Sequence, residues 1–351
     1  MIRIVLLASV TILVSLIITP FLVTFAKRLN ATDKPNERKV HSNPIPTLGG
    51  IAIFVSFLIG LLLLQPVGDY HTAILTGAFV IIALGFFDDV FELPPKVKLA
   101  VQLAVASFVV FWGGLQMEFI NLPFGGEIEF GFFSSIVTVL WIVGITNAIN
   151  LIDGLDGLAA GVSAIALLTL GVMAVIMGHV YVAAIAFILF FSTAGFLPYN
   201  FYPAKIFMGD TGALFLGYMI AVLALLGFKN VTVISFIIPI FIVGVPISDT
   251  LIAIVRRFIN RQPIGSPDSA HLHHRLIRAG FTHRQTVLFI YALNALFCTS
   301  AIFFSMTTVW GSILIFSVTL LTMQVLIENL ELINSDYKPL TNFLKGLRQR
   351  P

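Results

Sequence analysis

The chain alternates long apolar runs with short polar segments, and this pattern predicts membrane-spanning helices. Runs such as 4–26 and 232–255 reach the roughly 20 apolar residues that a helix needs to cross a bilayer. The first run is too long for a signal peptide and lacks a small-residue cleavage site, so we interpret it as a retained anchor. Eleven candidate spans follow from the pattern: 3–26, 48–65, 71–87, 99–116, 132–150, 158–177, 180–198, 211–228, 232–255, 285–307 and 311–330.

Basic residues are distributed unevenly among the polar segments. With the N-terminus outside, the inner segments hold 18 of the 20 Lys and Arg residues, which leaves only Arg3 and Lys229 outside. Because basic residues prefer cytoplasmic loops, this distribution predicts an outer N-terminus and a cytoplasmic C-terminus. The composition agrees, since 58% hydrophobic residues, 11% charged residues and a mean hydropathy of +1.01 exclude an ordinary soluble domain.

The predicted fold is an all-α polytopic membrane protein with one transmembrane domain, 1–330, and a basic cytoplasmic tail, 331–351. On the outer side, residues 117–131 alternate apolar and polar positions around two glycines, which predicts a small β-hairpin. Cys298 is the only cysteine, so it cannot form an intrachain disulfide and is assigned to packing. The inner segments that we expect to carry function are 27–47, 88–98, 150–157, 199–212 and 256–285.

Acidic residues at the ends of apolar runs are the strongest indication of a functional site. A carboxylate at the centre of a membrane helix costs roughly 2.5–3.5 kcal/mol, so such groups mark sites by default. The predicted topology gathers these residues on the inner face, which indicates a site for a divalent cation and phosphate at the membrane surface. The residues are Asp88, Asp89, Asp153, Asp156 and Asp210, with Asn147 and Asn150 preceding Asp153 at intervals of three.

Each of these residues also has a simpler interpretation when it is taken alone. Asp88 or Asp89 is suited to cap the helix that follows, and Asp210 to cap the apolar run after it. The polar run from 147 to 156 could be a helix end solvated by cytoplasm. Because all of these groups share one predicted membrane face, we favour a common binding site.

A histidine cluster lies in the long basic segment, as His271-Leu-His273-His274-Arg275. Histidine clusters often bind zinc, but no cysteine accompanies this one and Arg278 adds further positive charge. Nearby positive charge favours an anion such as pyrophosphate over a second cation. In the segment before Asp210, Asn200 and Phe207 offer an amide and a stacking surface for a nucleobase. Lys96 and Lys98 are suited to pair with a phosphate or only with lipid.

Taken together, these segments resemble the polyprenyl-phosphate N-acetylhexosamine-1-phosphate transferases, the family that includes the MraY, WecA and TagO branches. The resemblance to the WecA/TagO branch is greater, because Leu272 interrupts the three consecutive histidines typical of MraY, and the stretch 42–45 lacks the lysine that MraY-type proteins carry in the loop before the Gly-Gly pair. The motifs that carry the resemblance are Pro46-Thr-Leu-Gly-Gly50, Gly85-Phe-Phe-Asp-Asp89, the run from Asn147 to Gly157, Phe207-Met-Gly-Asp-Thr-Gly212 and His271-Leu-His-His-Arg275.

The resemblance implies a Mg²⁺-dependent phosphoglycosyltransferase, with Mn²⁺ as the alternative ion. Its donor would be UDP-GlcNAc and its acceptor undecaprenyl phosphate, giving undecaprenyl-diphospho-GlcNAc and UMP. The reaction would start a cell-surface glycan such as wall teichoic acid, at a bacterial plasma membrane with the active site facing the cytoplasm. The partners implied are these two substrates and membrane lipid, without nucleic acid, and a homodimer is compatible with the resemblance.

The resemblance also implies a role for each motif residue. For the metal, Asp210 would be the principal ligand, assisted by Asp89 and Asn150. Asp88 would deprotonate or orient the lipid phosphate, and direct attack by this phosphate is favoured over a covalent aspartyl intermediate because the phosphate is already ionised near neutral pH. Asn150 and Asp153 would hold metal-bound oxygens or the uridine side, with Asp156 supporting them. Asn200 and Phe207 would face the uracil. The diphosphate would be bound by His271, His273, His274 and Arg275, and His273 is counted among the catalytic residues.

Three other functions remain as alternatives. The same chemistry with another donor, UDP-GalNAc or UDP-MurNAc-pentapeptide, would keep the site and change the sugar. An ion-coupled transporter is disfavoured, because its polar groups should lie near the bilayer midplane and the two halves of the chain should show a repeat. A non-catalytic scaffold would give no reason for five polar motifs to share one membrane face.

Overall fold

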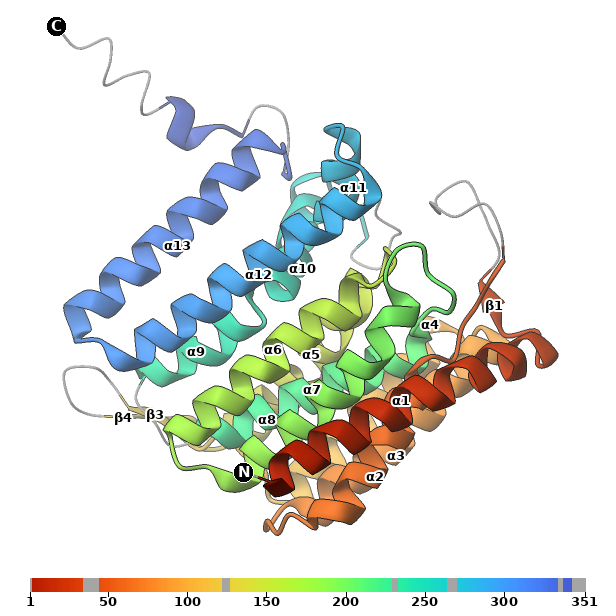
Figure 1. The fold of residues 1–351 in the computed structure, drawn as a ribbon. Helices are drawn as coiled ribbons and strands as arrows, with labels where there is room; N and C mark the ends of the chain where they lie inside the picture. Colours follow the sequence, from red (N-terminus) through yellow and green to blue (C-terminus); the bar gives the residue numbers. More distant parts are fainter. Residues whose placement is uncertain are drawn as a thin grey trace, which may run out of the picture.

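The computed structural model describes residues 2–33, 44–121, 127–228, 233–263, 270–333 and 337–342. The basic residues Arg38 and Lys39 of the first inner segment, Asp268 of the last one, and most of the tail lie outside these ranges. Within them the chain is mainly helical, and Figure 1 shows the helices running side by side as one bundle. The helices are α1 Ile2–Arg28, α2 Gly50–Leu64, α3 His71–Phe91, α4 Pro95–Phe111, α5 Phe133–Ile152, α6 Leu158–Ile176, α7 Val180–Asn200, α8 Gly209–Phe228, α9 Val233–Ile242, α10 Gly244–Ile259, α11 Leu272–Arg278, α12 His283–Met306 and α13 Val309–Asn329.

Eight helices in the described ranges are long and apolar enough to cross a membrane. They are α1, α3, α5, α6, α7, α8, α12 and α13, and all correspond to predicted spans. The predicted spans 48–65 and 99–116 are the shorter helices α2 and α4, with 15 and 17 residues.

The predicted ninth span, 232–255, for which Pro239, Gly244 and Pro246 predict a bend, is divided into two helices in the structure. The helix α9 ends at Ile242, and α10 begins at Gly244 after the non-helical residue Val243. Two prolines explain the break, because proline lacks the N–H of a helical hydrogen bond and is best tolerated in a first turn. Pro239 lies inside α9 and Pro246 in the first turn of α10.

The helix α8 forms the centre of the bundle, and nearly all of its described side chains are buried. Helices α3, α5, α6 and α2 pack around it, and α7 packs in turn against α6 and α1. Figure 1 shows α1, α2 and α3 on one side of this group and α12 and α13 on the other. The first turn of α8, which carries Asp210, is therefore surrounded by the ends of neighbouring helices.

Glycines allow the close approach of α2 and α3 to the start of α8. A Cβ atom on Gly85 would meet the Thr211 Cα and would lie 2.6 Å from the carbonyl oxygen of Asp210. A Cβ on Gly50 would similarly meet the backbone of Gly212. Real Cβ atoms do not come this close, so only glycine fits at these positions. Because Gly85 lies one turn before Asp88, this contact also brings the aspartates of α3 to α8.

Two short antiparallel pairs complete the structure. Strands β1 (Thr32–Asp33) and β2 (Ile45–Pro46) pair beside α1, and β3 (Phe119–Asn121) pairs with β4 (Glu127–Glu129). The pair β3–β4 lies where the sequence indicated a hairpin, with Ile120 opposite Ile128.

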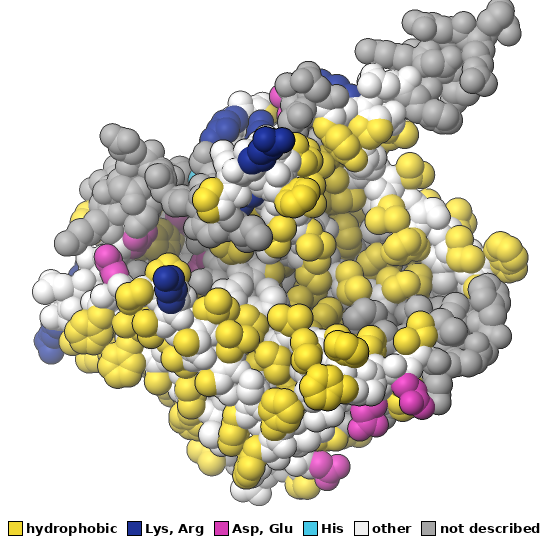
Figure 2. All heavy atoms as spheres, turned by 180° about the vertical axis from the view of Figure 1, so that it is seen from behind, with side chains coloured by type: hydrophobic (Ala, Val, Ile, Leu, Met, Phe, Trp, Pro, Cys, Tyr) yellow, Lys and Arg dark blue, Asp and Glu magenta, His cyan; other side chains and the backbone are white. Residues whose placement is uncertain are grey.

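Hydrophobic side chains cover much of the face that Figure 2 shows. Large apolar side chains such as Phe21, Phe111 and Trp310 are 71%, 68% and 80% exposed. Soluble proteins rarely expose apolar surface on this scale, whereas a lipid-facing surface requires it. The chain is therefore a multi-pass membrane protein.

Candidate active site

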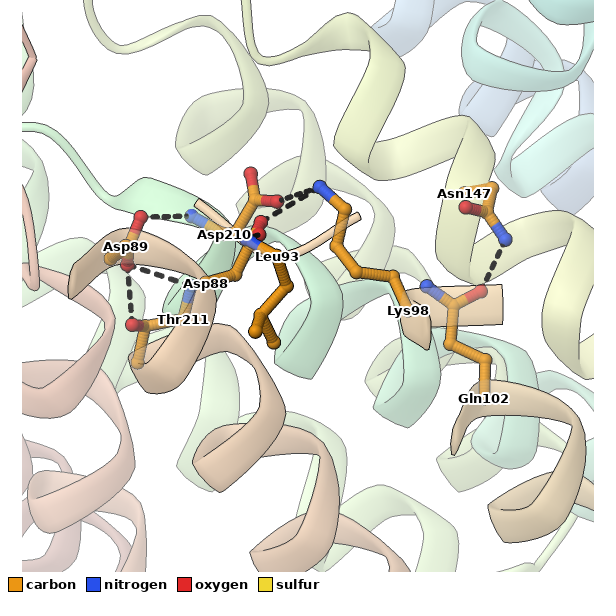
Figure 3. Close-up of polar contacts among 8 residues, drawn as sticks. All are labelled: Asp88, Asp89, Leu93, Lys98, Gln102, Asn147, Asp210 and Thr211. Atoms are coloured by element: carbon orange, nitrogen blue, oxygen red, sulfur yellow. Dashed lines mark hydrogen bonds and ion pairs between the residues drawn. The ribbon is translucent and has the colours of Figure 1, made fainter. Parts of the chain in front are cut away.

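A lysine lies between the two aspartates that the sequence placed in separate motifs. Lys98, in the first turn of α4, directs its Nζ to Asp88 Oδ2 at 2.7 Å and to Asp210 Oδ2 at 2.8 Å. Figure 3 shows this side chain reaching from α4 to carboxylates on α3 and α8. The second oxygen of Asp88 accepts a hydrogen bond from the Leu93 amide at 2.8 Å, which fixes the turn between α3 and α4. Helix ends distant in sequence therefore form one charged cluster.

Asp89 is directed to the backbone at the start of α8. Its Oδ1 accepts from the Asp210 amide at 3.0 Å, and its Oδ2 accepts from the Thr211 amide at 3.0 Å and the Thr211 hydroxyl at 2.5 Å. A carboxylate at a helix N-terminus satisfies unpaired N–H groups and interacts favourably with the helix dipole. Asp89 thus caps α8 from α3 and holds the backbone that carries Asp210.

The end of α5 brings two of the predicted residues to this cluster. Asn150 lies within hydrogen-bonding reach of Asp210. Asp153 follows the last residue of α5, and burial raises its pKa to about 8, with the negative charges of Asp210 and Asp89 adding to the effect. Neighbouring carboxylates raise the pKa of a carboxyl group in this way, and a bound cation would lower it again.

Asn147 lies one turn earlier and contacts a residue that the sequence reasoning missed. Its Nδ2 donates to Gln102 Oε1 at 2.5 Å. Gln102 is buried on α4, one turn after Lys98, and Figure 3 shows both side chains on the same side of that helix. The signal that could have found it is this spacing of four, which places a polar amide on the same helix face as the lysine.

Asp156 points toward a different set of partners. Its Oδ2 accepts from the Ala204 amide at 2.9 Å, and its Oδ1 lies 3.7 Å from His283 Nε2. The Asp156 amide also donates to His283 Nε2 at 3.1 Å. These contacts tie the turn after α5 to the loop before α8 and to the start of α12, so Asp156 supports the arrangement of the loops.

Asn200 and Phe207 are held by contacts within the loop before α8. The Asn200 Nδ2 donates to the Ile206 carbonyl at 3.0 Å and closes this loop. Phe207 pairs through its backbone with the Pro46–Gly50 motif: its amide donates to the Pro46 carbonyl at 2.8 Å, and its carbonyl accepts from Gly49 at 3.0 Å. The Pro46–Gly50 motif, one of those that carry the family resemblance, therefore holds the backbone of the loop that leads to Asp210.

The histidine cluster meets the turn that follows α5. A Cβ atom on Gly154 would lie 2.5 Å from His273 Nε2, so the ring of His273 packs directly against this glycine. Burial, with the neighbouring His274 adding to it, lowers the pKa of His273 to about 3. His273 is therefore neutral at physiological pH and meets a ligand as a hydrogen-bonding group. Arg275 follows in the same helix, α11.

The Lys98 cluster contains carboxylates of the kind that hold magnesium jointly with a substrate. The described ranges contain no group of three or more His, Cys, Asp and Glu side chains arranged to hold a metal by themselves. Asp88 and Asp210 converge on the ammonium group of Lys98, and the Asp210 side chain is 27% exposed. Mg²⁺ is commonly bound by one or two carboxylates, with substrate phosphates and water completing its coordination.

The comparisons with known proteins agree with these motifs. Glycosyl transferase family 4 matches residues 71–228, which include Asp88, Lys98, Asn150 and Asp210. The chain is 50% identical, over all of its own length and 98% of the relative, to a protein of Bacillus subtilis (strain 168) named "Probable undecaprenyl-phosphate N-acetylglucosaminyl 1-phosphate transferase".

Two further relatives are more distant. A "Decaprenyl-phosphate N-acetylglucosaminephosphotransferase" of Mycobacterium leprae (strain TN) is 33% identical over 80% of this chain and 79% of the relative. An "Undecaprenyl-phosphate alpha-N-acetylglucosaminyl 1-phosphate transferase" of Escherichia coli (strain K12) is 28% identical over 77% of this chain and 76% of the relative. With the full-length similarity to the Bacillus subtilis protein, the chain belongs to the polyprenyl-phosphate N-acetylhexosamine-1-phosphate transferase family.

Proposed function

We propose that this protein transfers GlcNAc-1-phosphate from UDP-GlcNAc to undecaprenyl phosphate, forming undecaprenyl-diphospho-GlcNAc and UMP. The names of the relatives give the donor sugar and the lipid acceptor. The observation that carries the proposal is the Asp88–Lys98–Asp210 cluster, which joins three helix ends at a polar patch of an otherwise apolar molecule. A phosphate-bearing lipid and a soluble nucleotide can meet only at such a boundary.

The acceptor phosphate is placed at Lys98 in this proposal. An oxygen of the lipid phosphate forms a bond to the sugar-linked phosphorus of the donor, and the bond from that phosphorus to UMP breaks, with UMP taking the electron pair. Lys98 Nζ orients the incoming phosphate by its charge, and Asp88 holds Lys98 in position at 2.7 Å. Preorganised positive charge at developing negative charge is a large contribution to catalysis.

The donor lies between Asp210 and the histidine cluster in this proposal. Asp210, with Asn150 within its reach, is the principal metal-binding carboxylate, and Asp89 supports it by fixing the start of α8. The metal, when bound, supplies charge neutralisation for the diphosphate. Arg275 and His274 bind the diphosphate as charged or polar donors, and the neutral His273 contributes a hydrogen bond rather than a charge.

We further propose that the site faces the cytoplasm of a bacterial plasma membrane. The distribution of basic residues supports this orientation, because 18 of the 20 Lys and Arg fall on the predicted inner side. UDP-sugars are cytoplasmic, and the product would begin a surface glycan such as wall teichoic acid.

A transfer assay on purified protein in detergent tests the proposed function. The assay combines undecaprenyl phosphate, Mg²⁺ and separate UDP-sugars, and it follows UMP release together with lipid-linked product. We expect release with UDP-GlcNAc that disappears with EDTA and returns with excess Mg²⁺. Activity with UDP-GalNAc alone would contradict the proposed donor, and silence from folded protein would contradict the proposed reaction.

A further inference from the structure

A further buried aspartate lies outside the cluster that the proposed function uses. Asp249 is in the second turn of α10, and only 6% of its surface is exposed. The helix α10 packs against α5, the helix that ends at Asn150 and Asp153. A buried carboxylate is costly unless hydrogen-bond donors meet it, so its partners indicate why the residue is present.

Both oxygens of Asp249 are directed to the start of the histidine cluster. Oδ2 lies 2.9 Å from His271 Nδ1, and Oδ1 accepts the Leu272 amide at 2.8 Å. His271 is the N-cap residue of α11 and is itself 6% exposed. One side chain therefore holds the ring of His271 and also the first N–H group of the helix that carries His273 and His274.

This pair of contacts determines which nitrogen of His271 can meet a ligand. A carboxylate only accepts hydrogen bonds, so Nδ1 of His271 carries the hydrogen in this contact. Unless Nε2 also carries a hydrogen, it then accepts hydrogen bonds, which suits a hydroxyl group or a water rather than a phosphate oxygen. The His271 ring is stacked almost parallel to the His273 ring, with centroids 6.0 Å apart and planes 4° apart. Because His273 packs against Gly154, fixing His271 also orients the histidine row relative to the α5 turn.

We propose that Asp249 is a positioning residue for the nucleotide-sugar donor, acting through His271 and α11. This inference rests on the proposed function, since it assigns His271 Nε2 to the nucleotide-sugar side of the same site. Asp249 acts at a distance: it sets the tautomer and direction of the His271 ring.

Two substitutions at position 249 separate the ring contact from the backbone contact. Asp249→Asn keeps an amide oxygen that can accept the Leu272 N–H, but it cannot accept from two donors as the carboxylate does. Asp249→Ala removes both acceptors. We expect Asp249→Asn to lower kcat/KM for UDP-GlcNAc by roughly 10- to 100-fold, the usual effect of removing a carboxylate that orients a functional histidine.

A matched control is available in α13. Glu328 is also a buried carboxylate, and it accepts hydrogen bonds from Gln324, Leu340 and Thr341 near the tail. Glu328→Gln therefore removes a buried charge of the same kind away from the proposed site. We expect this variant to keep kcat/KM within about two-fold of the wild type, because no proposed ligand contact depends on it.

A double-mutant cycle distinguishes positioning from general stability. If Asp249 acts through His271, His271→Ala and the Asp249→Asn/His271→Ala double variant should show similar kcat/KM, because the second change removes nothing further. Additive losses would overturn the proposal. UMP binding by calorimetry supplies a readout without turnover, and we expect Asp249→Asn to weaken it while the control Glu328→Gln leaves it within about two-fold.

Variants of His271 keep the test decisive if Asp249→Asn does not fold. In His271→Asn the side-chain amide mimics Nδ1 and can still donate to Asp249, whereas the group corresponding to Nε2 is lost. We expect this variant to fold with a raised KM for UDP-GlcNAc. Wild-type KM and kcat in folded His271→Asn or Asp249→Asn would refute the positioning role, whereas an inactive wild type would refute the proposed function instead.

Discussion

Asp88 and Asp210 share the ammonium group of Lys98, with N–O distances of 2.7 and 2.8 Å. Neither carboxylate can be assigned a role from its own motif, because each motif alone is also compatible with a helix cap. Asp89 shows the opposite case: its motif is also compatible with a metal ligand, but its contacts show that it caps α8 from the neighbouring helix α3. At the scale of single residues, the partner on the other helix decides the function of an aspartate.

Replacement of Asp210 by asparagine should abolish transfer without unfolding the protein. The amide keeps the shape of the side chain but loses the negative charge that the proposed metal and Lys98 both require. We expect kcat to fall by at least about 100-fold, the effect seen when one preorganised electrostatic group is removed from an active site. UMP release measures this loss. Glu331→Gln, which removes a surface carboxylate 3.3 Å from Lys338, should retain activity, and equal activity of the two variants would contradict the site.

The neutral state of His273 predicts a dependence of stability on pH. The folded protein holds the pKa of this ring at about 3, below the value of 6.5 for an unperturbed histidine, because the ring is buried and beside His274. As pH falls through 6.5, His273 takes up a proton in the unfolded chain but stays neutral in the folded protein. Folding stability is therefore lost between about pH 6.5 and 3. The slope from this group is at most about 1.4 kcal/mol per pH unit.

His273→Gln should therefore lose less thermal stability on acidification than the wild type. The measurement is Tm in detergent between pH 8 and 5, recorded without substrate. His179→Gln serves as the control, because His179 is exposed between α6 and α7 and far along the chain from the cluster. A Tm profile for His273→Gln that parallels the wild type would show that His273 is not held neutral.

At the scale of elements, hydropathy predicted the positions of the helices but not their internal breaks. The apolar run over 232–255 is continuous, so hydropathy alone carries no signal for the end of α9 at Ile242, and the prolines in the run predicted a bend rather than two helices. Pro239 and Pro246 were visible, but proline bends some membrane helices and interrupts others. The site motifs were predicted because polar groups are conspicuous in apolar runs. Contacts such as that of Asp156 with Ala204 were not predicted, because they depend on loop packing that no periodicity encodes.

The packing of α3 on α8 gives a prediction for the glycine at their contact. Gly85→Ala would place a methyl group 2.6 Å from the Asp210 carbonyl, which forces the two helices apart. Overpacking of this kind typically costs about 1–3 kcal/mol, and here it would also displace Asp88 from Lys98. We expect a lower Tm together with a reduced kcat.

Gly144→Ala is the matched control for this change. Gly144 also lies within a membrane helix, α5, but a Cβ there would meet nothing within 4 Å. The substitution should leave activity intact and should stabilise the helix slightly, by at most about 1 kcal/mol. If Gly144→Ala proved as harmful as Gly85→Ala, close approach of α3 to α8 would not be the cause.

At the scale of the whole molecule, the fold and the charge distribution support one orientation. Lys98 of α4 contacts Asp210 in the first turn of α8, and His273 of α11 packs against Gly154 after α5, so these groups lie at neighbouring helix ends. The opposite end holds the β3–β4 pair and the connection between α6 and α7. In the inverted orientation the site would face a compartment without UDP-sugars. The proposed function therefore requires the proposed orientation.

Cysteine labelling of intact cells tests this orientation directly. Cys298 is buried and is the only cysteine, so Cys298→Ala provides a background with no reactive thiol. On that background, Ala279→Cys lies at the exposed end of α11 and His179→Cys at the exposed turn between α6 and α7. We expect a membrane-impermeant maleimide to label His179→Cys in intact cells and to label Ala279→Cys only after permeabilisation, because basic segments stay on the cytoplasmic side. Labelling of Ala279→Cys in intact cells would place the site outside, and a cytoplasmic UDP-sugar could then no longer be its donor.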